Sequence, residues 1–152
     1  MFDLRPVLDQ LSAPGNFEIS VPEYFNFGVD VIDARAAEGD KTAYIWVDRS
    51  GGVVEHHSFS DLSQASNRFA NVLHQVGARK GDCAVVIMPR IPAWYEVVIG
   101  CIKAGVVAMP GTNLLTAKDI EYRINKSNAT VVVVSVEHVS KIETIKDRCP
   151  TL

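Results

Sequence analysis

The feature that most constrains the fold of this chain is the alternation of short apolar segments with amphipathic ones in its second half. The apolar segments at residues 84–88, 106–109 and 130–134 have the length of strands and lack the in/out alternation of half-exposed ones. We therefore expect strands buried on both faces. Segments with helical spacing follow them, at residues 93–104, 117–126 and 137–148. This order predicts an α/β fold with a parallel sheet layered between helices.

The first half of the chain has a different pattern, which predicts a β-hairpin between two helices. Residues 42–47 and 53–59 are rich in β-branched and aromatic side chains and flank a turn sequence at 48–52. Before the hairpin, a capping box at residues 20–23 is expected to start a helix that Gly39 ends. After it, Ser60 and Asp61 are expected to cap a helix that runs to Gly77.

Composition excludes several classes of protein. The net charge is −3 and no basic stripe occurs, so no nucleic-acid partner is expected. The three cysteines are widely spaced, which argues against a disulfide framework or a zinc knuckle and favours a reducing compartment. No stretch approaches the ~18 apolar residues of a transmembrane helix, and no leader pattern opens the chain.

Ligands of parallel sheets bind beyond the carboxyl ends of the strands, and three segments of this chain follow predicted strands. These segments are residues 89–92, 110–114 and 135–138. In the second, Gly111 allows a close backbone approach, and Thr112 and Asn113 offer hydrogen-bonding groups before a helix capped by Thr116. This loop can hold a phosphate or an adenine edge. The alternative is a turn that only links strand to helix.

Other candidate groups give weaker indications of chemistry. Arg90 lies between two prolines, where its guanidinium can face an anion; the alternative is a surface arginine or one paired with a local acid. His56 and His57 would point to opposite faces of a strand, so we expect no metal site there. No Walker loop, Gly-x-Gly-x-x-Gly or Gly-x-Ser-x-Gly motif occurs. The residues predict ligand-capable loops and no complete active site.

Nine short sequence words stand in order along residues 21–152, and together they carry a family resemblance. They occupy residues 25–33, 41–43, 67–73, 80–82, 88–94, 102–105, 110–112, 115–123 and 149–150. In this order they resemble the medium-chain acyl-CoA synthetases of the adenylate-forming (AMP-binding) superfamily. The Pro89-Arg90-Ile91-Pro92 and Thr116-Ala117-Lys118-Asp119-Ile120 words favour the medium-chain branch over the benzoate-type ligases.

The resemblance implies an ATP-dependent ligase of fatty acid metabolism for the full-length family member. In that family a carboxylic acid attacks ATP, with Mg, to give an acyl-adenylate and pyrophosphate, and CoA then takes the acyl group. The phosphate loop, the acidic magnesium residue, the ribose-binding Asp and the catalytic Lys of the family would follow Leu152. Residues 20–152 are therefore expected to form an incomplete N-terminal AMP-binding domain behind an extension at 1–19, inactive alone and without a tightly bound cofactor.

Site residues carry over from the family at one loop only. Relatives contact the CoA nucleotide from the segment that aligns with Thr112, Asn113 and Leu114. Because medium-chain relatives often have Gln where this chain has Leu114, only a backbone or apolar contact is expected there. Gly111 and Arg90 are added as binding candidates by their places in the motifs, and no catalytic residue is predicted.

Three further expectations concern the alternative functions, the self-association and the location of the chain. The alternatives to a medium-chain enzyme are a fragment of a benzoate or aryl-acid CoA ligase and a non-catalytic binding module of the same fold. An incomplete sheet would leave an unpaired edge and an apolar face, which predicts self-association or marginal stability. The expected location is the cytoplasm, with the mitochondrial matrix as the alternative in a eukaryote.

Overall fold

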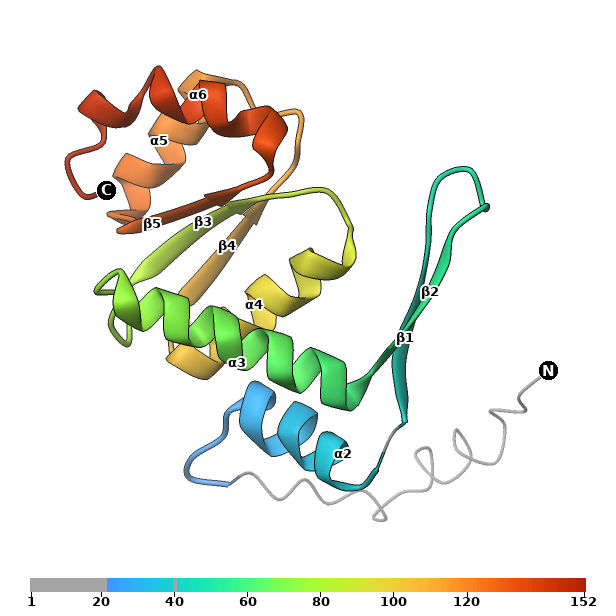
Figure 1. The fold of residues 1–152 in the computed structure, drawn as a ribbon. Coiled ribbons are helices and arrows are strands. Elements are labelled where there is room, and N and C mark those ends of the chain that lie inside the picture. The colour runs from blue at the N-terminus through green and yellow to red at the C-terminus, as the bar shows by residue number, and fades with distance from the viewer. Residues whose placement is uncertain (1–21, 40) are drawn as a thin grey trace, which may run out of the picture.

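The computed structural model describes residues 22–39 and 41–152, which form a parallel sheet, helices on both of its faces and a projecting hairpin (Figure 1). The sheet has the order β4-β3-β5, with β3 (Cys83–Ile87) in the centre and β4 (Val107–Gly111) and β5 (Val131–Val134) beside it. Both pairings are parallel, and Val85 stands opposite Met109 on one side and Val132 on the other. The predicted α/β fold is confirmed.

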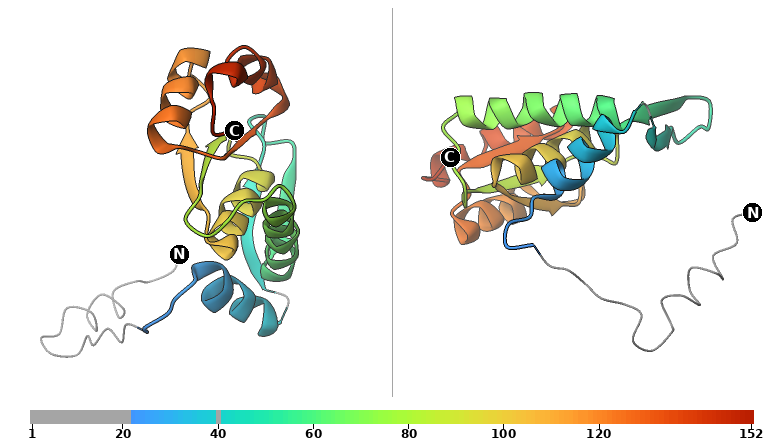
Figure 2. Two further views of the ribbon diagram at one scale, coloured as in Figure 1. Left: turned by 90° about the vertical axis from the view of Figure 1, so that its left-hand side faces the viewer. Right: turned by 90° about the horizontal axis from the view of Figure 1, so that it is seen from below.

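Helices cover the two faces of the sheet, as Figure 2 shows from two further sides. One face packs on α3 (Phe59–Gln75) and α4 (Pro92–Ala104), and the other on α5 (Ala117–Ser127) and α6 (Val139–Glu143). Successive residues of β3 serve opposite layers, because strand side chains alternate. Ala84 joins the core of α3 and α4, whereas Val85 joins the core of α5.

Only the central strand is buried on both faces. Residues 84–87 of β3 are fully buried, whereas the valines of β5 are partly exposed and Val107 of β4 is 50% exposed. The expectation of two-sided burial was therefore wrong for β4 and β5, because each pairs with a single neighbour within residues 22–39 and 41–152. Pro110 is tolerated in β4 because an edge strand needs no backbone donor on its open side.

The predicted hairpin is present and packs against α4. Strands β1 (Thr42–Val47) and β2 (Val54–Ser58) pair in antiparallel register. The Tyr44 ring stacks on His57 with a centroid distance of 4.7 Å and meets Tyr95 of α4 at 4.8 Å. Burial, more than the nearby Glu96, raises the pKa of Tyr44 to about 12.

The first described helix starts later than the sequence pattern predicts. Pro22 and Glu23 are not helical, and the π-helix η1 (Phe27–Asp33) begins after Asn26 and continues into α2 (Ala34–Ala37). The Asn26 side-chain oxygen accepts hydrogen bonds from the backbone N–H groups of Gly28 and Val29, at 3.0 and 3.4 Å. The expected extension at residues 1–19 and the serine of the expected cap lie outside the described residues.

Two other helix predictions need correction. Ser58, not Ser60, caps α3, because its hydroxyl accepts from the Asp61 N–H while the Asp61 carboxylate accepts from the Ser58 N–H. The single helix expected at 137–148 is three short ones, namely η2 (Val136–His138), α6 and η3 (Lys146–Arg148). Here the Thr144 hydroxyl donates to the Lys141 carbonyl and Arg148 donates to the Thr144 carbonyl, so side chains compete for helix acceptors.

A further structural fact concerns membranes. None of the described helices combines the length and the apolar character that crossing a bilayer requires.

Candidate functional site

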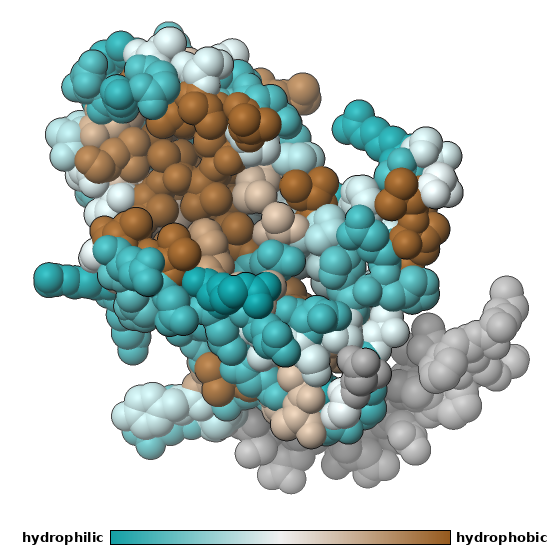
Figure 3. Space-filling view, viewed as in Figure 1, coloured by the Kyte–Doolittle hydropathy of each residue, from teal (hydrophilic) through white to brown (hydrophobic). Residues whose placement is uncertain are grey.

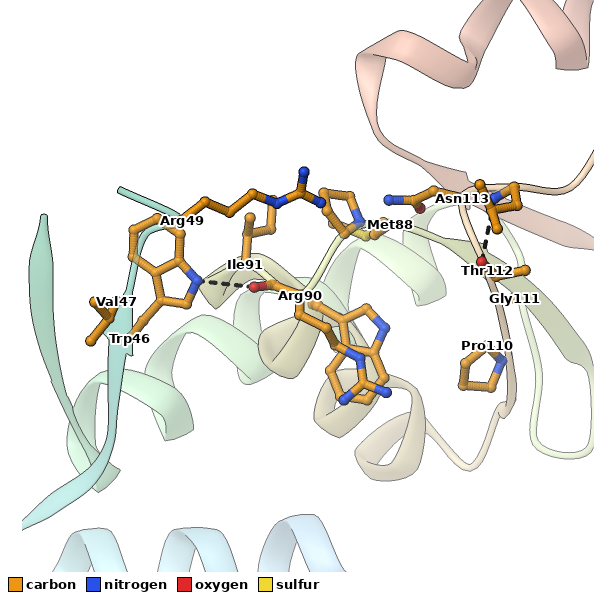
Figure 4. A pocket seen from close by; sticks show the side chains of 13 residues that line it. Trp46, Val47, Arg49, Met88, Arg90, Ile91, Pro110, Gly111, Thr112 and Asn113 are labelled. Carbon is orange, nitrogen blue, oxygen red and sulfur yellow. Dashed lines mark hydrogen bonds between the residues drawn. The ribbon is translucent and has the colours of Figure 1, made fainter. Parts of the chain in front are cut away.

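The structure brings two of the three candidate loops together around one cavity of about 860 Å³ (Figure 4). The segment after β3 and the segment that closes β4 form two of its walls, and the hairpin forms a third. The loop at 135–138 follows β5 at the same edge of the sheet but does not line this cavity. The lining residues are Trp46, Val47 and Arg49 of the hairpin, Met88 to Ile91 and Trp94, and Pro110 to Leu114.

Arg90 is held at the cavity by both its backbone and its side chain. Its carbonyl accepts a hydrogen bond from Trp46 Nε1 at 2.9 Å. Its guanidinium lies over the Trp94 ring, 4.5 Å from the centroid. Pro92 begins α4 and fixes the chain just beyond. Arg90 thus lines the cavity with its guanidinium stacked on an aromatic face, and anion binding by this residue remains a prediction.

The loop after β4 offers polar groups to the same cavity. Leu114 N–H donates to Thr112 Oγ1 at 3.3 Å, and Leu115 N–H donates to the Thr112 carbonyl at 3.2 Å, so the loop forms a tight turn. Asn113 Oδ1 is buried and has no hydrogen-bond partner among the described residues. A buried acceptor of this kind costs free energy until a donor reaches it. Leu114, by contrast, is 87% exposed.

Gly111 has a structural reason to be glycine. A Cβ added there would lie 2.7 Å from Leu115 Cδ1 and 3.4 Å from Ile87 Cγ1. Its missing side chain therefore makes room for Leu115 above the end of β3. The close approach of a ligand to Gly111 remains a prediction.

The third loop contains polar groups that are buried apart from the cavity. The His138 side chain is 8% exposed, and neither ring nitrogen has a hydrogen-bond partner among the described residues. Ser135 Oγ is likewise buried and unpaired in that part of the chain. The loop is tied to the β4 loop through α6, because Lys141 Nζ donates to the Leu115 carbonyl at 2.7 Å.

The composition of the cavity favours binding over acid–base chemistry. Two arginines and two indoles line it, and its lining in the described residues includes no carboxylate, imidazole or thiol. A general acid or base would need such a group within hydrogen-bond reach of the reacting atom. Indole faces and guanidinium groups instead suit an aromatic ligand that carries negative charge.

The hairpin residues of this cavity were not predicted from sequence. Trp46 and Arg49 belong to a two-stranded ribbon whose local pattern does not say which part of the sheet it will reach. Trp46 meets Arg90 across 44 positions of sequence. The only sequence signal is the indole itself, since a tryptophan side chain usually has a packing partner and a hydrogen-bond acceptor for its N–H.

The other candidate groups have ordinary surroundings. His57 Nε2 lies 3.1 Å from Glu55 Oε2, beside its stacking contact with Tyr44. Residues 22–39 and 41–152 contain no group of three or more His, Cys, Asp or Glu side chains arranged to hold a metal. All three cysteines are free, and burial raises the pKa of Cys101 to about 11, so that thiol is unreactive at neutral pH.

Comparison with known proteins identifies the family. Residues 32–151 match the AMP-binding enzyme family. The mitochondrial acyl-coenzyme A synthetase ACSM1 of Mus musculus is 37% identical over 155 aligned positions, covering 97% of this chain and 27% of that protein. The mitochondrial acyl-coenzyme A synthetase ACSM4 of Homo sapiens is 41% identical over 140, covering 87% and 24%.

A solved structure shows the same fold. The acyl-CoA synthetase of Brucella canis superposes with a TM-score of 0.76 at 23% identity, covering 96% of this chain and 26% of that one. The chain thus spans about a quarter of the length of the relatives that it matches. On the family match and these similarities, the chain belongs to the AMP-binding enzyme family.

Proposed function

We propose that this chain is the N-terminal part of an AMP-forming acyl-CoA synthetase that activates a medium-chain carboxylic acid with ATP and transfers the acyl group to CoA. Relatives named as acyl-coenzyme A synthetases support this activity over that of an aryl-acid ligase. They are also named as mitochondrial, which supports the matrix over the cytoplasm as its location. Residues 20–152 would form part of the N-terminal domain, without catalytic residues of their own.

The observation that carries the proposal is the meeting of two family words at one cavity. Pro89, Arg90 and Ile91 of one word and Pro110, Gly111 and Thr112 of the other line it, and Asn113 adds an amide whose oxygen has no partner in the described residues. The donor set fits the CoA nucleotide. The Asn113 side-chain amide can hydrogen-bond an adenine edge, an indole can stack on the base, and guanidinium groups can pair with phosphate. The lining of this cavity in the described residues includes no carboxylate that could hold Mg.

Tryptophan fluorescence provides a direct test of the nucleotide site. The chain has two tryptophans, and both Trp46 and Trp94 line the cavity, so intrinsic emission reports on it. CoA is expected to change this emission in a saturable way. Asn113→Ala should weaken CoA binding roughly three- to tenfold, because a hydrogen bond contributes about 0.5–1.5 kcal/mol.

The matched control is Asn71→Ala, which removes an exposed amide on α3 that does not line the cavity. It should leave the affinity for CoA unchanged. If millimolar CoA leaves the emission of the wild-type chain unaltered, the nucleotide site is wrong. The competing function, a non-catalytic module, is separated by reading the gene beyond codon 152, where an enzyme would encode the phosphate loop.

A further inference from the structure

The turn of the hairpin brings a second guanidinium to the cavity. Arg49 follows β1 in the turn, and its side chain lines the cavity together with Trp46 and Val47. In Figure 4 it extends from the hairpin toward the segment that holds Met88 and toward Asn113 beyond it. It therefore reaches across the mouth of the cavity from the wall opposite the β4 loop.

The turn that carries Arg49 is fixed by its own hydrogen bonds. Asp48 Oδ1 accepts from Val53 N–H at 3.1 Å, and Asp48 Oδ2 accepts from Ser50 Oγ at 2.7 Å. These contacts, led by the Ser50 hydroxyl, hold the pKa of Asp48 below its usual range. The neighbouring carboxylate is thus engaged inside the turn. Arg49 forms no ion pair or hydrogen bond through its side chain within the described part of the chain.

The opposite wall explains why Arg49 has a role distinct from that of Arg90. The Arg90 guanidinium stacks on Trp94, whereas the Trp46 indole holds the Arg90 carbonyl and so locks the hairpin to the β3–α4 segment. The Arg49 side chain takes part in neither of these contacts. No carboxylate of the described residues lines the cavity beside it.

We propose that Arg49 is a phosphate-binding residue that grips the phosphate groups of the CoA nucleotide, while the Asn113 side of the cavity takes the adenine. The assignment rests on the proposed CoA site and extends it to the hairpin. A guanidinium fork matches two phosphate oxygens at once, and the hydrogen-bonded turn fixes the backbone from which it extends. The hairpin would thereby serve as a wall of the binding site in addition to its packing on α4.

The experiment compares Arg49→Gln with the wild-type chain by the same tryptophan emission. The matched control is Arg68→Gln, at an exposed arginine of α3 whose side chain forms no hydrogen bond or ion pair with the described residues and does not line the cavity. CoA is titrated first, followed by pantetheine, which lacks phosphate, and then by ATP. We expect Arg49→Gln to weaken CoA binding at least about tenfold, because charge-assisted hydrogen bonds are lost, and Arg68→Gln to leave it unchanged. Pantetheine should not distinguish the three proteins.

Each outcome bears on a separate claim. If CoA binds the wild-type and Arg49→Gln proteins equally, the role of Arg49 is overturned while the proposed CoA site stands. If ATP binds at least as tightly and depends on Arg49, the choice of CoA is overturned. If CoA fails to bind the wild-type chain, pyrophosphate is titrated instead. A change in tryptophan emission that is lost in Arg49→Gln would retain Arg49 as a phosphate-binding residue, and no change in the wild-type chain would overturn that role.

Discussion

Lys103 of α4 is a charged residue whose side chain is only 5% exposed. Its ammonium pairs with the Asp33 carboxylate and donates to Asn67 Oδ1 at 2.8 Å and to the Ser63 carbonyl at 3.2 Å. All three ammonium protons thus have acceptors, as a buried charge requires. The contact joins η1, α3 and α4, which are far apart in sequence.

Loss of the Asp33 carboxylate should destabilise the fold. In Asp33→Ala the buried ammonium loses its counter-charge, and we expect the free energy of unfolding to fall by about 2–4 kcal/mol, somewhat below a fully buried pair because Asp33 is 33% exposed. Urea denaturation measures the change. Glu38→Ala is the control, since Glu38 pairs with Arg35 and Lys41 at the surface and should cost less than about 1 kcal/mol. Equal effects of the two substitutions would contradict a structural role for the buried pair.

The residues that carry the family resemblance divide into two structural groups. Asn26, Asp33, Asn67 and Lys103 belong to words at 25–33, 67–73 and 102–105, and they form contacts between helices; Asn26 Nδ2, for example, donates to the Ile102 carbonyl at 2.9 Å. Most residues of the words at 88–94 and 110–112 line the cavity instead. Sequence order alone did not separate residues that stabilise the fold from residues that line the cavity. Only the three-dimensional contacts show which side chains already bind other parts of the protein.

At the scale of elements, helices α3 and α5 both begin with a capping box. Asp61 accepts from Ser58 at the start of α3, and Asp119 accepts from Thr116 at the start of α5. The cap of α5 was predicted and is confirmed. The cap of α3 was misplaced by two residues, although Ser58 and Asp61 have the three-residue spacing of a capping box and Ser60 lacks an acid at that spacing.

These caps predict an acid dependence of stability. Hydrogen bonds from Ser58 and from Thr116 lower the pKa of Asp61 and of Asp119. A folded-state pKa below the unfolded one stabilises the fold above the unfolded pKa, and that stability is lost as pH falls through the folded pKa. The free energy of unfolding should therefore decrease below pH ~4.

Urea denaturation at several pH values checks this prediction. The double variant Asp61→Asn with Asp119→Asn should show a shallower decrease, since it cannot titrate at either cap. Asp147→Asn is the control, because its carboxylate accepts no hydrogen bond in the described residues and its replacement should leave the slope as it is. An unchanged slope in the double variant would assign the acid sensitivity to other carboxylates.

At the scale of the whole molecule, the described part of the chain has an apolar area over its open sheet edge. Figure 3 shows hydrophobic side chains gathered over β5, between α3 and the helices α5 and α6. The four valines of β5 are partly exposed, and the strand pairs only with β3 in the described residues. An edge of this kind offers unpaired backbone groups to another chain.

We expect the 152-residue chain to associate through this edge. Its average mass by light scattering should rise with protein concentration. Val133→Lys should reduce that rise, because a charge on an edge strand disfavours strand pairing. Val54→Lys, at a 53% exposed position on the hairpin, should not. A concentration-independent monomer that melts cooperatively at ordinary temperatures would contradict the prediction.

The sequence by itself determined the fold class, the strands and most of the helices, since strand length, helical period and the Thr116 cap depend on neighbours within a few residues. It also located Arg90 and the 111–114 loop, because ligand loops follow strand ends in any parallel sheet. Only the tertiary structure decided that the hairpin closes the cavity with Trp46 and Arg49, and that the loop at 135–138 stays outside it. Contacts across more than 40 positions, such as Trp46 to Arg90, depend on how whole elements pack, and no local pattern encodes that.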